Sequence, residues 1–387
     1  MKAMEGINTI AQKRLRSGFT TGSCAAAAAQ AAVQLLLSGN RPDWVHLLTP
    51  KGTKLTLKVA SGVLENDQAV CAIRKDSGDD PDITNGVLVY AHVSKAIAGI
   101  HIDGGEGVGR VTKPGLNQPV GEAAINSVPR QMIQDACQKA ADEHGYQGGF
   151  CVIISIPGGE ALALKTFNPR LGIEGGLSVI GTTGIVEPMS NAALVETIRL
   201  ELNVLASSGE KAVLLSPGNY GEAFSRDVLG LDITKQVLCS NLIGIALEDA
   251  VEKGFQQILL VGHIGKLVKL GIGMANTHSC FGDGRLETLA ACAIQAGAAL
   301  PVLQALLECA TTDAALHVLY KANCLKETMD VLKPRIDDFL MRMVPEGVDV
   351  GFVCFTTDPT FKGVLMASDN AIQLMTHWGT KEAGFLG

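Results

Sequence analysis

The chain has 387 residues, with 32 Lys and Arg against 39 Asp and Glu, so its formal net charge is −7. This acidic balance argues against a protein whose main task is to coat nucleic acid, which needs a basic surface. Charged residues make up only 18% of the chain, below the usual ~25%, which is consistent with surface closed off in a homo-oligomer. At roughly 150 residues per domain, the length predicts two domains, or three at most.

The N-terminal residues and the cysteines favour a cytoplasmic protein. Residues 1–10 lack the apolar run of a secretory signal. The longest apolar stretch, 25–37, is too short to span a bilayer. The ten cysteines form no CxxC pair and the eight histidines no HExxH motif, so the usual spacing of a metal site is missing. We therefore expect reduced thiols, no membrane association and no metal held by the protein.

The first half, residues 1–188, predicts helices and strands in no regular alternation. Ser23 is a candidate N-cap for an alanine-rich helix that Gly39 ends. The further expected elements are strands over 55–59, 69–74 and 150–156, a helix that Thr84 caps and that runs to about 98, and a helix that opens at Pro129. This order predicts an α+β domain.

The second half, residues 189–387, alternates. A helix begins near Ser190, and apolar strands are expected over 212–215, 236–239, 258–261 and 350–355, with helices between them. This βαβ pattern predicts an α/β domain with a parallel sheet, whose ligands bind at the carboxyl ends of the strands. A domain boundary near Pro188 fits both the irregular order of the first half and the regular alternation of the second half.

Two glycine-containing loops follow predicted strands of the second half, over 216–221 and 262–266. Their backbone N–H groups are suited to an anion or a nucleotide-like ligand. Neither loop is GxGxxG or a Walker A loop, so ordinary strand-to-helix turns remain the alternative. Lys266 and Lys269 lie one turn apart, either as paired cations or on a solvated face. The candidate ligand-binding residues are Gly218, Asn219, Gly221, Gly262, His263 and Gly265.

Two polar segments of the first half are further candidates. Four aspartates lie within residues 76–82, where they suit a hard cation or a general base, or else form a turn before a helix. Residues 104–115 hold five glycines together with Arg110 and Lys113, two cations that suit carboxylate groups of a ligand. The alternative for this second segment is a flexible hairpin.

Two single residues have both a structural and a chemical interpretation. Cys24 lies at the expected start of a helix, where a thiolate is favoured, but a buried structural cysteine is the better interpretation. His278, in a polar cluster after the second glycine loop, is either a base or a structural histidine.

Several short motifs follow one another along the chain. They are GFTTGSC at 18–24, KDSGDDPD at 75–82, the glycine-rich segment 104–115, AIN at 124–126 with Pro129 and Arg130, NPRLGI at 168–173, IGTTGIVEP at 180–188, GHIGKLVK at 262–269 and NTHS at 276–279. Together they resemble the cobalt-precorrin-5B C(1)-methyltransferases. Phe19 and Ser23 differ from the Tyr and Thr expected there, and neither change removes a chemically necessary group.

The resemblance implies methyl transfer from S-adenosylmethionine to C-1 of cobalt-precorrin-5B, giving cobalt-precorrin-6A in anaerobic cobalamin synthesis. It also implies a first domain similar to a rearranged ribosomal-protein-S5 domain 2, followed by a smaller α/β domain. Cobalt arrives inside the corrinoid substrate. The substrate-binding candidates are Thr20, Thr21, Arg110, Lys113, Arg170, Lys266 and Lys269, and the catalytic candidates are His278 and Asp80.

Two other functions fit parts of the sequence. A phosphoryl-transfer enzyme would use the glycine loops for phosphates, but no GxxxxGK[ST] motif is present. A non-catalytic tetrapyrrole carrier would bind the corrinoid without consuming S-adenosylmethionine. Two separate glycine-loop systems suit two ligands and therefore favour the enzyme.

Overall fold

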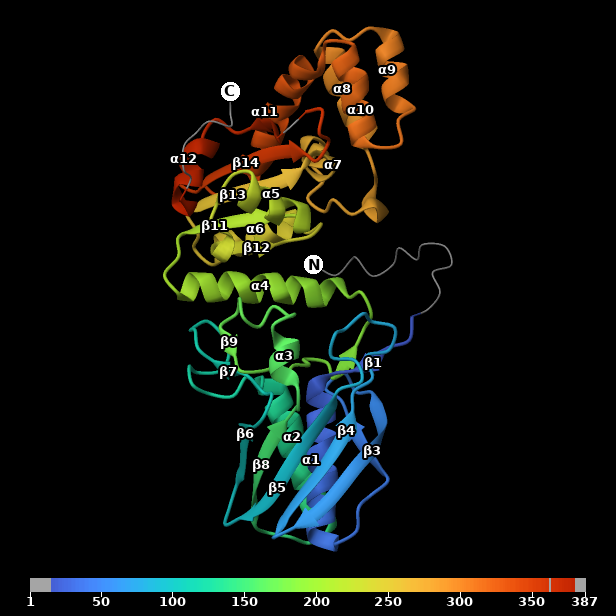
Figure 1. The fold of residues 1–387 in the computed structure, drawn as a ribbon, viewed down its shortest axis with the longest axis vertical. Coiled ribbons are helices and arrows are strands. Elements are labelled where there is room, and N and C mark those ends of the chain that lie inside the picture. The colour runs from blue at the N-terminus through green and yellow to red at the C-terminus, as the bar shows by residue number, and fades with distance from the viewer. Residues whose placement is uncertain (1–14, 362, 380–387) are drawn as a thin grey trace. The chain divides into compact units, whose positions relative to one another are not determined.

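The computed structural model describes residues 15–361 and 363–379. The chain divides into two compact units, one ending at Asn191 and the other beginning at Ala192 (Figure 1). No helix among the described residues is both long and apolar enough to cross a bilayer.

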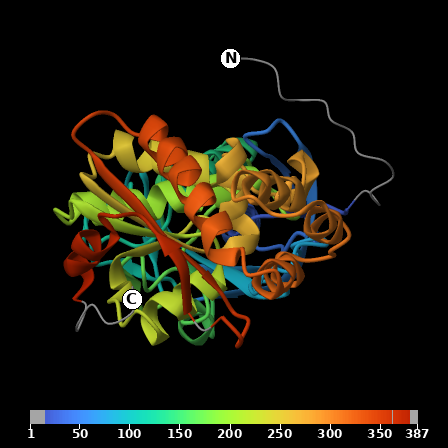
Figure 2. The same cartoon turned by 90° about the horizontal axis from the view of Figure 1, so that it is seen from above.

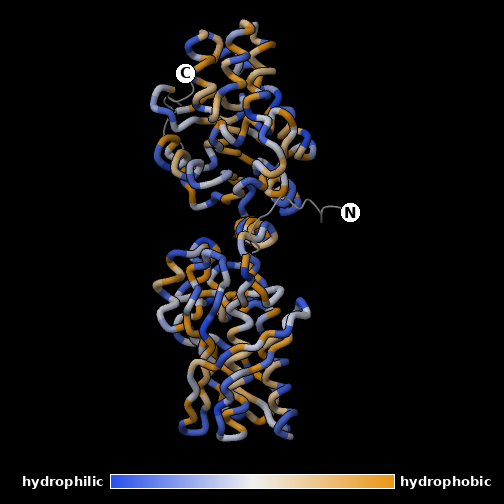
Figure 3. The backbone as a smooth tube through the Cα atoms, turned by 90° about the vertical axis from the view of Figure 1, so that its right-hand side faces the viewer, coloured by the Kyte–Doolittle hydropathy of each residue, from blue (hydrophilic) through white to orange (hydrophobic). Residues whose placement is uncertain are grey.

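A six-stranded sheet forms the first unit, in the order β2-β3-β4-β5-β8-β6. Neighbouring strands are antiparallel except β6 and β8, which are parallel. The strands are β2 (Trp44–Leu48), β3 (Lys54–Glu65), β4 (Gln68–Arg74), β5 (Leu88–Ala96), β6 (Ile100–Gly104) and β8 (Gly149–Ser155). Buried and more exposed residues alternate along β2 and β5, because one face of the sheet is covered and the other is not. Figure 3 shows hydrophilic and hydrophobic stretches interleaved in this unit.

Two helices, α1 (Thr21–Ser38) and α2 (Ser127–Glu143), pack on each other and cover one face of this sheet (Figure 1). The alanines at 25–29 of α1 are fully buried. Their small side chains allow α1 to pack closely against both α2 and the strands. The buried face expected for α2 is confirmed at Met132, Ile133 and Cys137.

The predicted start of α1 was three residues late. The N-cap is Thr20, whose side chain accepts a hydrogen bond from Ser23 N, whereas the Ser23 hydroxyl donates to Gly184 O. Gly39 ends the helix as expected, at φ 73°. Cys24 is fully buried and burial raises its pKa to about 12, so the structural interpretation of this cysteine is confirmed.

The helix predicted over 84–98 was wrong. This segment contains β5, in which burial alternates from residue to residue. Thr84 does not cap a helix, since its N–H and its hydroxyl both donate to Asp82 in a turn before the strand. The valines at 87, 89 and 93 fit a pleated surface between β4 and β8 better than a helix.

Shorter elements complete the first unit. A short helix, α3 (Gly159–Ala163), follows β8. Two small antiparallel pairs join β1 (Gly18–Phe19) to β10 (Ile185–Val186) and β7 (Arg110–Val111) to β9 (Ile173–Glu174). These pairs bring motifs that are distant in the sequence side by side.

The second unit contains a five-stranded sheet in the order β12-β11-β13-β14-β15. The first four strands are parallel and β15 is antiparallel to β14. The strands are β11 (Ala212–Ser216), β12 (Gln236–Leu238), β13 (Gln257–His263), β14 (Asp349–Thr356) and β15 (Gly363–Ala367). The parallel α/β arrangement predicted for this half is confirmed.

Helices cover both faces of this sheet. The apolar side chains of α5 (Asn219–Asp227) and α12 (Ala371–Met375) pack on one face. Those of α4 (Asn191–Ser207), α6 (Ile243–Glu252) and α11 (Leu325–Met343) pack on the other. The helices α8 (Arg285–Gln295), α9 (Leu300–Leu307) and α10 (Thr312–Lys321) contact one another and form the orange cluster in Figure 2.

The strand order places a topological switch point between β11 and β13. From β11 the chain passes through α5 to β12 on one side, and then through α6 to β13 on the other side of β11. In such sheets ligands bind outside the carboxyl ends of the strands at the switch point, and we call this place, at the ends of β11 and β13, the crevice.

Candidate functional site

The two glycine loops predicted from the sequence meet at this switch point. Lys266, in the short helix α7 (Ile264–Leu267), donates from Nζ to Pro217 O at 2.6 Å and to Ser240 O at 3.4 Å. One ammonium group therefore joins the loops that follow β11, β12 and β13. Burial lowers the pKa of Lys266.

Gly218 begins helix α5 with φ 122° and ψ 178°, a conformation that disfavours any side chain. An added Cβ would lie 3.7 Å from the Lys266 ammonium nitrogen. The backbone N–H groups of Asn219 and Tyr220 follow in the first turn, and no acceptor among the described residues is recorded for either. N–H groups beside a cation suit an anionic group of a ligand.

The other glycines of the two loops allow close packing. A Cβ at Gly221 would lie 2.7 Å from Val261 O, and one at Gly262 would lie 2.8 Å from the Leu267 side chain. At Gly265 the nearest atoms would be His263 Nδ1 and Thr312 Oγ1, both at 3.3 Å. These glycines allow α5 and α7 to pack close against β13.

His263 ends β13 and caps α7. Its Nδ1 accepts a hydrogen bond from Gly265 N at 3.1 Å, so the neutral ring carries its proton on Nε2. Burial lowers the pKa of His263, against an opposing effect of Asp313. The ring meets Phe355 edge-on, with centroids 5.6 Å apart, and lies 6.5 Å from Tyr220.

Four polar residues at this edge of the sheet were not predicted. The Thr356 hydroxyl, at the end of β14, donates to Asp313 Oδ1 at 2.7 Å. His263 Nε2 lies 3.8 Å from the same oxygen. Beside them, His317 Nε2 and Asp358 Oδ2 lie 2.9 Å apart. The polar residues directly after the apolar strand 350–355 were the available signal, whereas nothing in the sequence marked Asp313 or His317.

The remaining candidates of the second unit lie in local contacts. Lys269 is buried, and its Nζ donates to Thr277 O at 3.1 Å and to Gly282 O at 2.9 Å. It holds the loop that contains His278, so the solvated-face alternative is wrong for Lys269. The His278 ring is exposed, and its Nδ1 accepts a hydrogen bond from Cys280 N at 3.1 Å.

Thr20 and Thr21 are buried at the start of α1 in the first unit. Thr20 caps the helix, and the Thr21 hydroxyl both donates to Ile180 O and accepts from Ile180 N. The two threonines therefore join the first motif to the IGTTGIVEP segment. Their side chains hold the backbone in place.

The cations of the first unit lie near β7 and β9. Arg110 forms a two-pronged ion pair with Asp103, at 2.9 and 3.0 Å, and holds the pKa of that carboxyl below its usual value. Arg110 therefore binds a carboxylate of the protein itself, where the sequence predicted a carboxylate of a ligand. Lys113 and Arg170 are exposed, and the Lys113 stem lies over Gly172.

The acidic loop is a structural element whose aspartates all have partners. Arg16 pairs with Asp76 and donates its backbone N–H to Asp79. Asp80 Oδ1 accepts from Met189 N at 3.0 Å, and Asp82 pairs with buried Lys75. Between residues 15 and 379, leaving out 362, no three His, Cys, Asp or Glu side chains gather as metal ligands.

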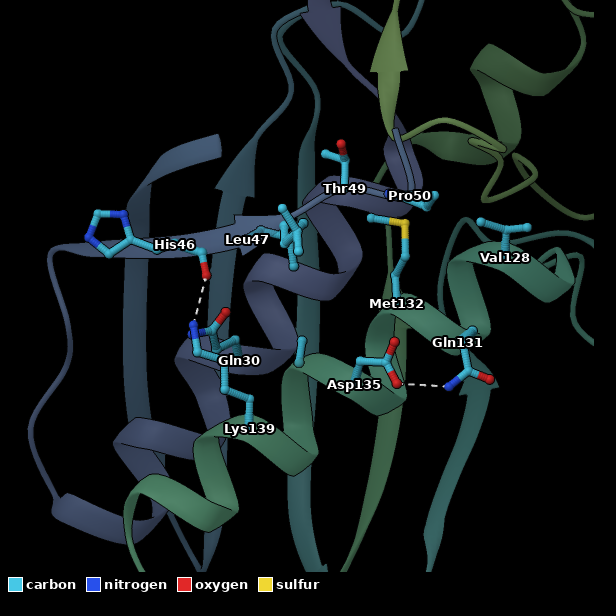
Figure 4. A pocket seen from close by; sticks show the side chains of 12 residues that line it. Gln30, His46, Leu47, Thr49, Pro50, Val128, Gln131, Met132, Asp135 and Lys139 are labelled. Carbon is cyan, nitrogen blue, oxygen red and sulfur yellow. Dashed lines mark hydrogen bonds between the residues drawn. The ribbon is translucent and has the colours of Figure 1, made fainter. Parts of the chain in front are cut away.

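A cavity of about 500 Å³ lies in the first unit between β2, α1 and α2 (Figure 4). Leu47, Pro50 and Met132 form apolar walls. Gln30 lines it from α1 with its side chain almost fully buried, and its Oε1 has no hydrogen-bond partner among the described residues. Lys139 reaches across from α2 to His46 O at 3.3 Å. None of these residues was predicted.

Comparisons with known proteins agree along most of the chain. A family model described as CbiD matches residues 8–188, and one described as CbiD, C-terminal domain, matches 276–368. A cobalt-precorrin-5B C(1)-methyltransferase from Ruminiclostridium cellulolyticum is 47% identical over 319 residues, covering 82% of this chain and 83% of the relative. Proteins of the same name from Photorhabdus laumondii and Salmonella arizonae are 43% and 47% identical, each covering 93% of this chain and 92% of the relative.

One solved structure is also similar, the cobalamin biosynthesis protein CbiD from Archaeoglobus fulgidus. It is 30% identical, covers 72% of this chain and 84% of its own, and has a TM-score of 0.38. The family matches and the full-length relatives support the resemblance seen in the motifs. This chain belongs to the CbiD family, the cobalt-precorrin-5B C(1)-methyltransferases.

Proposed function

We propose that this chain transfers a methyl group from S-adenosylmethionine to C-1 of cobalt-precorrin-5B, giving cobalt-precorrin-6A. The observation that carries the proposal is family membership, with relatives named for this reaction that align along 82–93% of the chain. A phosphoryl-transfer enzyme and a tetrapyrrole carrier are not favoured by these relatives.

We place the methyl donor in the crevice between the ends of β11 and β13. Three features support this placement: the glycine-only conformation of Gly218, the Lys266 ammonium, and the N–H groups of Asn219 and Tyr220, for which the described residues offer no acceptor. They suit the carboxylate of an amino-acid moiety. Adenosine-containing ligands also favour the switch point of a parallel sheet.

The corrinoid substrate carries several carboxylate side chains, which call for cationic partners. Lys113 and Arg170 are exposed in the first unit, and Arg110 is exposed with its Asp103 partner. We propose that these three residues bind substrate carboxylates. The six-stranded sheet with two helices on one face supports, as a further proposal, a rearranged S5-like fold for this unit.

S-adenosylmethionine supplies a methyl group that is already activated by its sulfonium. The residues of this chain therefore bind the two ligands, hold them in line and exclude water, and orientation of this kind can supply about 7–11 kcal/mol. A strong general base is not obligatory. We retain His278 and Asp80 as candidates for moving a proton, since both carry exposed or half-buried titratable side chains.

Mass spectrometry of the cobalt-corrinoid tests the proposal. Cobalt-precorrin-5B is incubated with the full chain and S-adenosylmethionine, and the expected result is a gain of one methyl group with release of S-adenosylhomocysteine. An unchanged corrinoid mass in the presence of tight corrinoid binding would instead identify a carrier. Donor carrying a labelled methyl group establishes the origin of the added carbon.

A further inference from the structure

We propose that the crevice holds the methyl donor in one orientation, with its methionyl carboxylate at Lys266 and its ribose hydroxyls at Asp313. This inference rests on the proposed function, which places an adenosyl ligand at this edge of the sheet. It assigns a binding role to Asp313, a residue of helix α10 that no motif marked.

The Asp313 carboxylate is held in place and has one open oxygen. Its Oδ1 accepts a hydrogen bond from the Thr356 hydroxyl at 2.7 Å and lies 3.8 Å from His263 Nε2. Its side chain is 34% exposed, and within the described part of the chain no donor to Oδ2 is recorded. A fixed carboxylate at the carboxyl edge of a parallel sheet is suited to accept hydrogen bonds from ribose hydroxyls.

The neighbouring acid, Asp358, is a weaker candidate. It is paired with His317 at 2.9 Å, accepts a hydrogen bond from Thr360 N at 2.8 Å, and is only 17% exposed. Its two oxygens are therefore already in use. Of these two acids, Asp313 is the one with an oxygen left for a ligand.

The strand order separates Lys266 from Asp313 along the carboxyl edge of the sheet. The Lys266 ammonium bonds to the loops after β11 and β12, whereas Asp313 contacts the last residues of β13 and β14. In the strand order β12-β11-β13-β14 these positions are two interstrand spacings apart, or about 10 Å. The methionyl chain and the ribose together can reach across such a span.

The opposite charges determine which end of the ligand lies where. A methionyl carboxylate is attracted to the ammonium and to the N–H groups of Asn219 and Tyr220 at the start of α5. The reverse orientation would place that carboxylate beside Asp313, where two anions repel each other. Ribose hydroxyls, which are hydrogen-bond donors, complement Asp313.

Calorimetric titration of the full chain, with and without the corrinoid, tests the orientation. The ligands are S-adenosylhomocysteine, its analogues without the 2′- or 3′-hydroxyl, and its decarboxylated analogue. For the wild type we expect each deletion to weaken binding by about tenfold or more. Asp313→Asn keeps an acceptor for Thr356 and should lose the discrimination against the deoxy analogues while keeping that against the decarboxylated one.

Lys266→Gln should give the converse result, losing the discrimination against the decarboxylated analogue alone. Asp338→Asn, at an exposed aspartate of α11, is the matched control and should retain the wild-type pattern. Asp313→Ser, which suits the first turn of a helix, serves as the second variant if Asn disturbs the fold as judged by circular dichroism.

Two results would overturn the orientation while leaving the proposed function intact. One is an equal loss of affinity for all four ligands in Asp313→Asn, as a purely structural residue would cause. The other is the reverse pattern, in which Asp313→Asn loses the discrimination against the decarboxylated analogue and Lys266→Gln loses that against the deoxy analogues. If the wild type bound no adenosyl ligand even with the corrinoid, the placement of the donor in this crevice would fail together with the orientation.

Discussion

The ammonium nitrogen of Lys266 lies 2.6 Å from the carbonyl oxygen of Pro217, which is 49 positions earlier in the chain. This bond joins the loops after β11 and β13 at the point where the strand order reverses. It places a cation beside Gly218 at the start of α5, since a Cβ added to Gly218 would lie 3.7 Å from that nitrogen.

Binding of S-adenosylhomocysteine should depend on pH through Lys266. Burial lowers the pKa of this lysine in the folded chain below its ordinary 10.5, so the ammonium loses its proton at a lower pH than an exposed lysine does. The affinity should therefore be fully present below that folded pKa and fall as the pH rises through it. Titrations from pH 7 upward measure this, and Lys266→Gln should show no such fall; the same fall in this variant would assign it to another group.

Gly218→Val should weaken thermal protection by S-adenosylhomocysteine. A side chain at φ 122° is strained and adds a Cβ near Lys266, so binding should weaken and the variant should lose about 1–3 kcal/mol of stability. Gly297→Val is the matched control, since Gly297 also has positive φ but no atom within 4 Å of the added Cβ. Protection is read as the shift in melting temperature, and equal protection of both variants would leave the loop after β11 as a turn only.

Arg110→Ala should raise the dissociation constant of the corrinoid and leave that of S-adenosylhomocysteine nearly unchanged. Arg110→Lys should recover only part of the loss, because lysine lacks the two-pronged geometry. Asp103→Asn removes the charge that now occupies Arg110 and should keep or tighten corrinoid binding. Equal corrinoid affinity in all four proteins, measured by titration with the fold checked by circular dichroism, would leave the Arg110 pair as a surface contact worth about 1 kcal/mol or less.

Lys75→Met should destabilise the first unit by about 3–5 kcal/mol, the usual cost of breaking a buried ion pair on one side. Lys75 is 2% exposed and pairs with Asp82. Burial acts to raise the pKa of Asp82, but hydrogen bonds from Lys75 and Thr84 outweigh it and hold the pKa below 3.8. The contribution of this ion pair to the free energy of unfolding is therefore present above pH 3.8, and it is lost as the pH falls through the folded pKa of Asp82.

Urea unfolding at pH 7 and near pH 3 measures the effect of Lys75. Lys51→Met is the control, because Lys51 pairs with Glu187 at an exposed site and should cost about 1 kcal/mol or less. A loss for Lys75→Met no greater than for this control would show that the acidic loop does not depend on its buried lysine.

Local patterns in the sequence were sufficient to predict most helices and strands and the positions of the two glycine loops. Dense apolar runs predicted β11, β13 and β14, because a strand covered on both faces is apolar throughout. The segment 84–98 failed because Thr84 before an apolar stretch also fits a helix. The segment forms a strand because it pairs with β4 on one side and β8 on the other.

The family, the parallel sheet of the second half and the loops at the ends of its central strands could all be predicted from the residues, since each depends on sequence neighbours or on motif order. Which side chains meet at the carboxyl edge of that sheet depends on the folded chain. Asp313 meets Thr356 across 43 positions, and Lys269 turns to loop carbonyls while Lys266, three residues earlier, joins the crevice. Such contacts depend on strand order and helix packing, which long-range burial fixes and no local pattern contains.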